Sequence, residues 1–376
     1  MPTLNETPSG NRIRLSFFGK RNAGKSTLIN ALAGQNVAIV SDTPGTTTDP
    51  VSKAMEILPL GPCLLTDTAG LDDEGPLGEL RVKKSLEMLE KTDIAIIVSA
   101  DDLGPLENGL IAECDRRKIA HIVHLRGESV ETLKDKIARL APPDAAPPLV
   151  GDLVRPGDVV VCVCPIDSAA PKGRLILPQQ QVVRELLDSG AIPVVCRETE
   201  LSAALSRLSS PPTFAITDSQ AFGVVSKTLP TDIPLTSFSI VFARAKGDLA
   251  LYAAGAAALS ALKDDDRILI AEGCTHRRQC ADIGTVKLPA WIRSFTGKNL
   301  EFSWVSGNDF PDDLSPYSLV VHCGGCMLTR RAVQARLARC RAAGVPITNY
   351  GICIATCHGI RFSPESRMVA RTSSAR

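Results

Sequence analysis

The stretch GKRNAGKST, from Gly19 to Thr27, matches the phosphate-loop pattern G-x-x-x-x-G-K-[ST]. It follows an apolar run and precedes a helical pattern, which is the context that this motif requires. In such a loop the glycines let backbone N–H groups surround the phosphates, Lys25 reaches the β- and γ-phosphates, and the Ser26 hydroxyl binds Mg²⁺. The sequence therefore predicts a nucleotide site, whose candidate residues are Gly19, Asn22, Ala23, Gly24, Lys25, Ser26 and Thr27.

Two later segments supply the remaining parts of a nucleotide-hydrolysing site. The threonine-rich loop PGTTTDP is bounded by Pro and Gly and suits a switch that closes over the γ-phosphate. The run LLTDTAG ends a strand in Asp67, which is placed to hold Mg²⁺ through water, and Gly70 is placed to donate its N–H to the γ-phosphate. A phosphate loop, a threonine loop and D-x-x-G in this order are typical of a small GTPase domain.

These motifs resemble the branch of GTPases that includes Era and the tRNA-modification GTPases, which share G-x-x-N-x-G-K-S and a GTT switch. The resemblance implies that Asn22 coordinates K⁺ in place of an arginine finger, and that Thr47 is the Mg²⁺ ligand of the switch. Leu71 stands where Ras-like proteins have a catalytic glutamine, so hydrolysis is expected to be slow and to depend on the cation and an ordered switch. The candidate catalytic residues are Asn22, Lys25, Thr47, Asp67 and Gly70.

The base-specificity motif N-K-x-D is missing from its expected place. After the apolar run IAHIV the chain reads His124-Leu125-Arg126-Gly127, so no aspartate is present to pair with guanine. The nearby carboxylate of Glu128 is a weak substitute. Nucleotide binding is therefore predicted, while use of ATP and relaxed base specificity both stay open.

Cysteines at two strand ends indicate a second kind of chemistry. VVHCGGCMLTRR places His322, Cys323 and Cys326 where a buried strand turns into a helix. EGCTHRRQC places Cys274 and His276 directly after the strand pattern RILIA. Strands of one parallel sheet present their carboxyl ends at one edge, so the two segments are expected to converge. Three thiolates from two loops suit an iron–sulfur cluster, whereas cysteine together with histidine also suits zinc.

The remaining cysteines are expected to be buried in the core rather than to bind a metal. Twelve cysteines are many for a reducing compartment, where disulfides are disfavoured, so clustered cysteines indicate metal binding and scattered ones indicate small buried residues. The stretch GICIATCHG offers a rival ligand set, although burial is favoured for it and for the pair in VVVCVC. The rival set is Cys353, Cys357 and His358, and the cysteines expected in the core are Cys63, Cys114, Cys162, Cys164, Cys196 and Cys340.

Alternating strand and helix patterns must position these residues. Between residues 13 and 140 this alternation predicts a doubly wound α/β arrangement. APPDAAPPLV (141–150) contains four prolines and is predicted to be a linker. A second α/β segment runs to the alanine-rich helix YAAGAAALSALKDDDR, and a third, from about residue 264, repeats the strand-to-helix pattern. The tail SPESRMVARTSSAR is expected to be frayed.

Composition argues against several classes of protein. A length of 376 residues suggests two or three domains, and 44% hydrophobic with 22% charged residues is ordinary for a globular protein. A net charge of +1 and 4% aromatic residues argue against nucleic-acid binding, and the arginine-rich helix at 330–341 is expected to present a solvated face. No signal peptide and no run of about 18 apolar residues is recognisable, so no membrane contact is expected. The expected location is the cytoplasm or an organelle matrix, reducing and anaerobic.

Over nearly its whole length the chain resembles the HydF family of iron–iron hydrogenase maturation GTPases. The middle and C-terminal strings are more specific to this family than the phosphate loop, because other GTPases do not share them. The strings are DTAGLDDEGPLGELRVKKS, CPIDSAAPKGRLILPQQQ, TDSQAF, PLTSFSIVFARAKGDL, CTH, DIGTVKLPAW, YSLVVHCGGCML and GVPITNYG.

The resemblance implies three α/β domains. These are an N-terminal P-loop GTPase domain at 1–145, a middle dimerisation domain at 146–262 and a C-terminal iron–sulfur cluster domain at 263–376. The protein would be a homodimeric scaffold that hydrolyses GTP, receives a transient di-iron subcluster precursor and delivers it to apo iron–iron hydrogenase. The two radical-SAM maturases would be its other partners.

The resemblance also implies a ligand set for the cluster. Cys274, Cys323 and Cys326 would bind a 4Fe–4S cluster. Its fourth iron site would be open, exchangeable or bound by His276 or His322. An iron with no thiolate could take an exogenous ligand, which a carrier needs.

Two other functions fit parts of the sequence. One is an Era-type RNA- or ribosome-associated GTPase with a zinc site, although no KH-like domain and no aromatic stacking platform is recognisable. The other is a dimeric scaffold whose nucleotide site has degenerated, as the missing N-K-x-D suggests. Iron and sulfide content separates the first alternative from a hydrogenase scaffold, and nucleotide hydrolysis separates the second.

Overall fold

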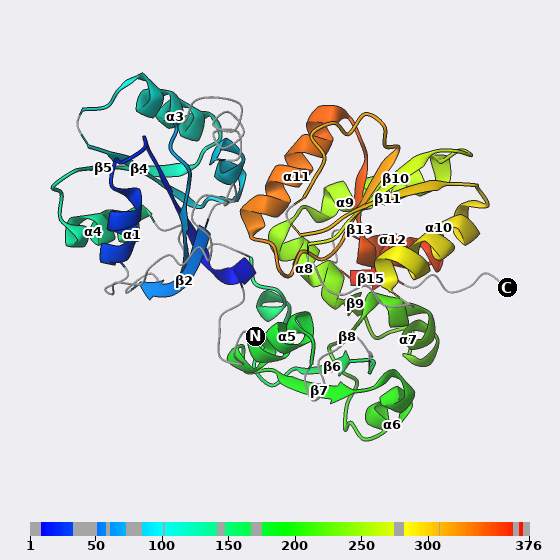
Figure 1. The fold of residues 1–376 in the computed structure, drawn as a ribbon. Coiled ribbons are helices and arrows are strands. Elements are labelled where there is room, and N and C mark those ends of the chain that lie inside the picture. The colour runs from blue at the N-terminus through cyan, green and yellow to red at the C-terminus, as the bar shows by residue number, and fades with distance from the viewer. Residues whose placement is uncertain are drawn as a thin grey trace. The chain divides into compact units, whose positions relative to one another are not determined.

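The computed structural model describes most of the chain in ten stretches. These are residues 9–32, 51–57, 61–72, 85–100, 102–140, 147–166, 175–273, 282–307, 309–363 and 368–370. The chain forms two compact units, residues 1–145 and 146–376 (Figure 1). Each unit has its own hydrophobic core clusters. The predicted boundary between 146–262 and 263–376 lies inside the second unit and stays a prediction.

The first unit is built on a five-stranded sheet in the order β2-β3-β1-β4-β5. Neighbouring strands are parallel, except that β2 and β3 pair antiparallel at one edge. The elements are η1 Ser9–Asn11, β1 Ile13–Phe18, α1 Lys25–Leu32, β2 Val51–Ile57, β3 Gly61–Asp67, η2 Leu89–Lys91, β4 Ile94–Ser99, α3 Pro105–Arg116, β5 Ala120–Leu125 and α4 Val130–Leu140.

The strand β4 shows why helices cover both faces of this sheet. All of its residues are buried, and their side chains alternate between two core clusters. Ile94 and Ile96 pack in one cluster with side chains of α1 and α4. Ala95 and Ile97 pack in another cluster with side chains of α3, which lies on the opposite face (Figure 1). The doubly wound α/β arrangement predicted for this part of the chain is confirmed.

The second unit contains two sheets. One has six strands in the order β14-β15-β9-β8-β6-β7, and the other has four parallel strands in the order β11-β10-β12-β13. The strands are β6 Val159–Val163, β7 Ile192–Cys196, β8 Phe214–Thr217, β9 Leu235–Ser237, β10 Arg267–Ala271, β11 Glu301–Val305, β12 Leu319–His322, β13 Ile347–Asn349, β14 Arg361–Ser363 and β15 Met368–Ala370.

Helices connect and cover these two sheets. The described α-helices are α5 Leu177–Asp188, α6 Leu201–Leu205, α7 Phe222–Thr228, α8 Phe238–Lys246, α9 Leu249–Ala257, α10 Leu288–Thr296, α11 Arg330–Ala343 and α12 Tyr350–Cys357. Short 3-10 helices are η3 Gly151–Leu153, η4 Glu198–Glu200, η5 Ser219–Ala221 and η6 Ala258–Ala261, and η7 Ile283–Lys287 is a π-helix. No helix in the described part of the chain is long and apolar enough to cross a membrane.

The C-terminal segment differs from the expected frayed tail. β14 and β15 pair antiparallel, and Val369 of β15 pairs with Leu235 of β9. The segment therefore extends the six-stranded sheet that begins the second unit. Strands of three residues carry too little alternation of apolar and polar side chains to be recognised in a sequence.

The strands that precede the cysteine motifs are neighbours. β10 and β12 run parallel, and Ala271 pairs with His322 at the carboxyl ends of both strands. The chain leaves β10 toward Gly273 and leaves β12 into Cys323. The predicted placement of the two strand ends at one edge is therefore confirmed, while Cys274 and His276 lie outside the described residues.

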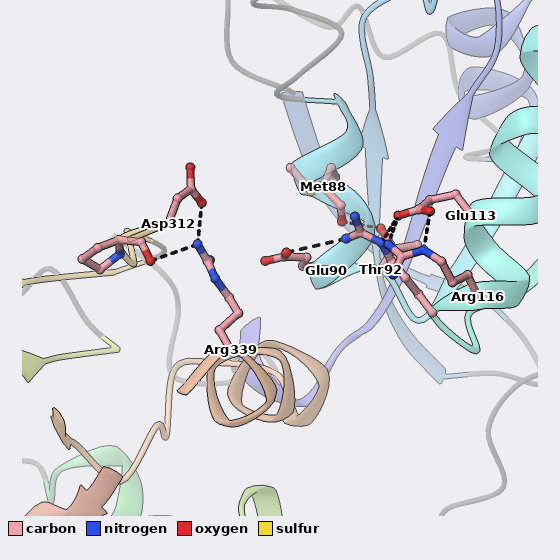
Figure 2. A network of polar contacts seen from close by, with 9 residues as sticks. Met88, Glu90, Thr92, Glu113, Arg116, Asp312 and Arg339 are labelled. Carbon is pink, nitrogen blue, oxygen red and sulfur yellow. Dashed lines mark hydrogen bonds and ion pairs between the residues drawn. The ribbon is translucent and has the colours of Figure 1, made fainter. Parts of the chain in front are cut away.

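Each unit carries ion pairs whose side chains are at least partly exposed to solvent (Figure 2). In the first unit Glu113 of α3 accepts a hydrogen bond of 2.5 Å from Arg116 Nη2 and also pairs with Arg117. In the second unit Arg339 of α11 donates to Asp312. Exposed pairs of this kind contribute about 0–1 kcal/mol each, so the folded state of each unit depends mainly on its buried core.

Candidate functional site

The phosphate loop joins the end of β1 to the start of α1. Gly19 has φ +150°, and a Cβ there would lie 2.2 Å from the Val98 carbonyl oxygen, so no other residue fits. Gly24 and Asn22 also take left-handed backbone angles, with φ of +101° and +59°. This backbone turns the N-terminus of α1 toward the loop, as a phosphate site requires.

Lys25 is held inside this loop. Its side chain is buried, and Nζ donates to the carbonyl oxygens of Gly19, at 3.0 Å, and Lys20, at 2.8 Å. These contacts fix the ammonium group at the mouth of the loop, where it can bind the β- and γ-phosphates. The backbone at the start of the predicted loop thus holds the Lys25 ammonium group.

Ser26 and Asp67 come together from α1 and β3. Ser26 Oγ donates to Asp67 Oδ2 at 2.5 Å, while Oδ1 of the same carboxylate is buried without a hydrogen-bond partner. Burial raises the pKa of Asp67, and the hydrogen bond from Ser26 opposes that shift. A buried carboxylate oxygen without a partner beside a serine hydroxyl is a donor set that fits Mg²⁺. The predicted third ligand, Thr47, lies outside the described residues.

The D-x-x-G segment is tied to the phosphate loop. The Leu71 N–H donates to the Gly19 carbonyl at 3.2 Å, and a Cβ on Gly70 would lie 2.9 Å from the Arg21 nitrogen. Gly70 therefore sits directly against the loop, as its predicted role next to the γ-phosphate demands. The Arg21 N–H donates to Asp72 Oδ1 at 2.6 Å, a contact that the sequence analysis missed.

Side chains at and just after the end of β5 contact one another or the phosphate loop, at the position where a nucleotide base would be recognised. Glu128 pairs with Lys136, and its second oxygen lies 3.3 Å from His124 Nδ1. The hydrogen bond from Lys136 is the main cause that lowers the pKa of Glu128. Arg126 Nη2 donates to the Asn22 carbonyl at 3.2 Å, which links this segment to the phosphate loop. No sequence pattern signals that contact, because 104 residues separate its partners.

The second site is the cysteine loop, residues 323–329, which joins β12 to α11. Cys323 Sγ accepts hydrogen bonds from the N–H groups of Gly273, at 3.0 Å, and Gly325, at 3.3 Å. Burial raises the pKa of Cys323, and these two N–H groups oppose that shift. Gly273 directly precedes Cys274, so the chain that enters Cys274 passes beside the Cys323 sulfur.

His322 is buried and has a partner at each ring nitrogen. Nε2 lies 3.0 Å from Arg336 Nη1, and Nδ1 lies 2.7 Å from the Cys323 carbonyl oxygen. Arginine only donates, so Nε2 accepts and Nδ1 carries the proton that it donates to Cys323. Burial, followed by the Arg336 charge, lowers the pKa of His322 to about 3. Both nitrogens are therefore occupied, and the geometry favours a positioning role over a fourth iron ligand.

Arg336 differs from the solvated helix face expected for this segment. Its side chain is buried, and besides contacting His322 it donates to the Gly307 carbonyl at 2.6 Å. The guanidinium also lies over the Phe310 ring at 5.1 Å from the ring centre. The prediction was wrong for this residue because arginine count alone does not show which helix face meets the sheet edge.

The rival cysteine set does not form a metal site in the part of the chain that the structure describes. Cys353 of α12 is buried, and its pKa is raised chiefly by a hydrogen bond with Cys357. His358 packs edge-on against Trp291, with ring centres 5.5 Å apart. Among the described residues no group of three His, Cys, Asp or Glu side chains could hold a metal ion. Cys274 and His276 are not part of that set.

Comparison with known families identifies three segments of the chain. The family described as hydrogen maturase F dimerization domain matches residues 149–247, and the hydrogen maturase F tetramerization domain matches residues 250–362. The 50S ribosome-binding GTPase family matches residues 14–127. The cysteine loop lies in the second of these matches and the phosphate loop in the third.

Curated relatives match shorter stretches. A GTPase Der of Wolinella succinogenes is 42% identical over 98 residues, which cover 25% of this chain and 20% of the relative. A tRNA modification GTPase MnmE of a Methylobacterium species is 34% identical over 159 residues, covering 38% of this chain and 36% of the relative. The chain thus spans about a third or less of the length of these relatives.

Solved structures resemble the chain only weakly. The G domain of the FeoB iron transporter of T. maritima is 20% identical, with a TM-score of 0.27, and covers 35% of this chain and 100% of its own. The family matches carry the assignment instead, because together they extend over the GTPase segment and both hydrogen maturase segments. The chain belongs to the HydF family of hydrogen maturases, with a GTPase domain at its N-terminus.

Proposed function

We propose that this protein is a GTP-hydrolysing scaffold for hydrogenase maturation, which holds a 4Fe–4S cluster and delivers a di-iron subcluster precursor to apo iron–iron hydrogenase. The observation that carries the proposal is the contact between the Gly273 N–H and Cys323 Sγ at 3.0 Å. It places the backbone that enters Cys274 beside the first cysteine of the C-x-x-C pair. Cys274, Cys323 and Cys326 are the proposed ligands of the cluster.

The groups around the cysteine loop support a cluster in which one of the four irons is not bound by a cysteine thiolate. N–H groups that point at a thiolate sulfur stabilise its charge, as they do in iron–sulfur sites. The two partners of His322 leave that imidazole outside the ligand set, so the fourth iron is left to His276 or to an exogenous group. An exchangeable fourth position is what a carrier needs to accept and release its cargo.

The first unit supplies nucleotide hydrolysis. Ser26 and Thr47 would hold Mg²⁺ directly and Asp67 through water, with Lys25 on the phosphates and Asn22 on K⁺. The buried Asp67 oxygen without a partner supports the magnesium site. Hydrolysis would govern the exchange of partners rather than the cluster chemistry.

The partners would be a second copy of the chain, the two radical-SAM maturases and the apo-hydrogenase. Family matches to a dimerization and a tetramerization domain support assembly of several copies. The two maturases and the apo-hydrogenase are proposed as partners from the family alone, and no surface in the described part of the chain is assigned to them. Neither nucleic acid nor a membrane is a proposed partner.

Delivery is tested by activation of apo iron–iron hydrogenase. The protein is loaded by the two maturases, freed of them and incubated anaerobically with the apo-enzyme. Wild type and the Cys357→Ala control are expected to confer hydrogen evolution, and Cys323→Ala is expected to lose it. Activation by Cys323→Ala equal to wild type would contradict a role for the cysteine loop in delivery.

A second candidate is a scaffold that binds a nucleotide without hydrolysing it. The missing N-K-x-D motif, which suggests a degenerate nucleotide site, favours it, and the nearby carboxylate of Glu128 is already paired with Lys136. Phosphate release by the wild-type protein in Mg²⁺ and K⁺ separates the two candidates. If no phosphate is released under these conditions, the proposal that the site hydrolyses GTP is contradicted and nucleotide binding alone is supported.

A further inference from the structure

Lys246 is a buried cation at the end of α8 that contacts the cysteine loop. Its Nζ donates to the carbonyl oxygens of Gly325, at 3.1 Å, Cys326, at 3.1 Å, and Leu328, at 2.7 Å. A protonated lysine has three N–H donors, and here three carbonyl groups of one loop accept them. A neutral amine has one donor fewer and would leave one of these buried carbonyls without its partner.

The rest of α8 also lies against the loop. A Cβ on Gly324 would lie 3.2 Å from the Ser239 Cα, so the loop backbone approaches the start of the helix closely. Cys326 packs against a core cluster that includes Phe238 and Phe242 of α8. The helix belongs to the segment matched by the dimerization family, whereas the cysteines belong to the segment matched by the tetramerization family.

The loop is thus held from two sides by buried cations. Arg336 of α11 fixes His322, whose Nδ1 donates to the Cys323 carbonyl. Lys246 of α8 fixes the three later carbonyls. The end of α8 is held in turn, because Gln334 Nε2 donates to the Lys246 carbonyl at 2.9 Å. Cys323 and Cys326 therefore belong to a loop whose backbone is held by Lys246 and, through His322, by Arg336, and both of these cations are buried.

We propose that Lys246 is a positioning residue of the cluster site, which fixes the loop that presents Cys323 and Cys326 and places a buried positive charge beside their sulfurs. This inference rests on the proposed function, in which these cysteines hold a cluster. Three thiolates give a 4Fe–4S cluster a net negative charge, and its one-electron reduction adds another. A nearby buried cation stabilises the reduced form more than the oxidised form, so it raises the reduction potential.

The test compares three variants of the full-length protein. Lys246→Met keeps an unbranched side chain that is one atom shorter, but it removes the charge and all three donors. Lys246→Arg keeps the charge but cannot direct three donors to the same carbonyls. Lys298→Met is the control. The exposed ammonium group of Lys298 lies 3.7 Å from an Asp264 carboxylate oxygen and does not belong to the contacts that hold the cysteine loop.

Two readouts separate loop positioning from charge. In the apo-protein, the alkylation of Cys323 and Cys326 is followed by mass spectrometry. It is expected to be at least about tenfold faster in both Lys246 variants than in wild type, because the loop opens more often when the three hydrogen bonds from Lys246 are lost or weakened. In the reconstituted protein, the midpoint potential of the cluster is expected to fall in Lys246→Met and to stay near wild type in Lys246→Arg. Lys298→Met is expected to match wild type in both.

The inference fails if Lys246→Met shows the alkylation rates and the midpoint potential of wild type. If Lys246→Met does not fold, Lys246→Arg decides the positioning claim, because unchanged alkylation in a folded Lys246→Arg contradicts it. A wild-type protein that holds no iron would overturn the proposed function. The alkylation measurement needs no iron, so it still decides whether Lys246 fixes the loop.

Discussion

His322 and Arg336 show how single residues shape the cysteine site. The imidazole bridges Arg336 Nη1, at 3.0 Å, and the Cys323 carbonyl, at 2.7 Å, so it transmits the position of α11 to the backbone of a proposed ligand. The sequence placed a histidine beside two cysteines but did not show which group would face it. The partner became visible only in the fold, because Arg336 stands 14 residues further along the chain on a helix face.

Asp67→Asn is expected to slow nucleotide hydrolysis by about 10²–10³-fold, because the amide would remove the negative charge proposed to hold Mg²⁺ through water. Phosphate release at saturating GTP and Mg²⁺ measures the effect. Glu131→Gln is the control, since Glu131 is exposed and pairs with Lys134, three residues along α4, at 3.0 Å. Hydrolysis by Asp67→Asn within a factor of two of wild type would show that this carboxylate does not serve the metal.

GTP and ATP are expected to bind with affinities within about tenfold of each other, because Glu128 is paired with Lys136 and so does not offer guanine a free bidentate acceptor. Competition titrations with both nucleotides measure the ratio. Lys136→Ala frees the carboxylate and is expected to raise the preference for GTP, whereas Lys134→Ala is expected to leave it unchanged. A GTP preference above about a hundredfold in wild type would require a guanine contact elsewhere.

The stability of the first unit is expected to fall as the pH drops below about 6.5, because burial lowers the pKa of His124 from its ordinary value of 6.5. A histidine with a lowered folded pKa takes up its proton more readily in the unfolded chain. Its contribution is therefore complete above the unfolded pKa and is lost as the pH falls through the folded pKa.

Hydrogen exchange of the peptides that cover β5 and α4, compared at pH 7 and pH 5, measures this effect. After correction for the intrinsic pH dependence of exchange, His124→Gln is expected to lose much of the difference, and His121→Gln is expected to keep it. Equal pH dependence in wild type and His124→Gln would show that another group is responsible.

At the scale of elements, α8 is the helix that joins several parts of the second unit. Near its end Arg244 Nη1 donates to the carbonyl oxygens of Pro148 and Leu149, at 3.0 Å each, in the last residues of the predicted linker. Two residues later Lys246 holds the cysteine loop. One helix thus anchors both the first described residues of the unit and the proposed cluster site.

Arg244→Ala is expected to lower the free energy of unfolding of the second unit by about 2–4 kcal/mol, because it removes the guanidinium that donates to two carbonyls and pairs with Asp152. Urea denaturation followed by far-UV circular dichroism measures the change. Arg184→Ala on α5 is the control, because Arg184 forms an exposed pair with Asp188 and is expected to change stability by less than about 1 kcal/mol. Equal unfolding midpoints for the two variants would contradict the anchoring role.

The elements around both sites could largely be predicted from local patterns, and the contacts between them could not. The strand before Gly19, the helix after it and the strand that ends in His322 each leave a short-range signal of apolar periodicity. Lys246 leaves no such signal, because 82 residues separate it from Leu328 and its burial depends on how α8 packs. The return of β15 to β9 was missed for the same reason, since a three-residue strand is defined by its partner.

At the scale of the whole molecule, the two chemistries belong to different compact units. The phosphate loop lies in residues 1–145 and the cysteine loop in residues 146–376. The second unit contains both hydrogen maturase matches, and α8 and the cysteine loop connect them inside one fold. We therefore expect the second unit to hold an iron–sulfur cluster and the first unit to bind and hydrolyse a nucleotide.

Iron and sulfide determination after anaerobic reconstitution, together with the visible absorbance of thiolate-bound iron, tests that claim most directly. Wild type and Cys357→Ala are expected to hold about four iron and four sulfide per chain. Cys274→Ala, Cys323→Ala and Cys326→Ala are each expected to lose most of both. Wild-type cluster content in Cys323→Ala, or zinc in place of iron in the wild-type protein, would contradict the account.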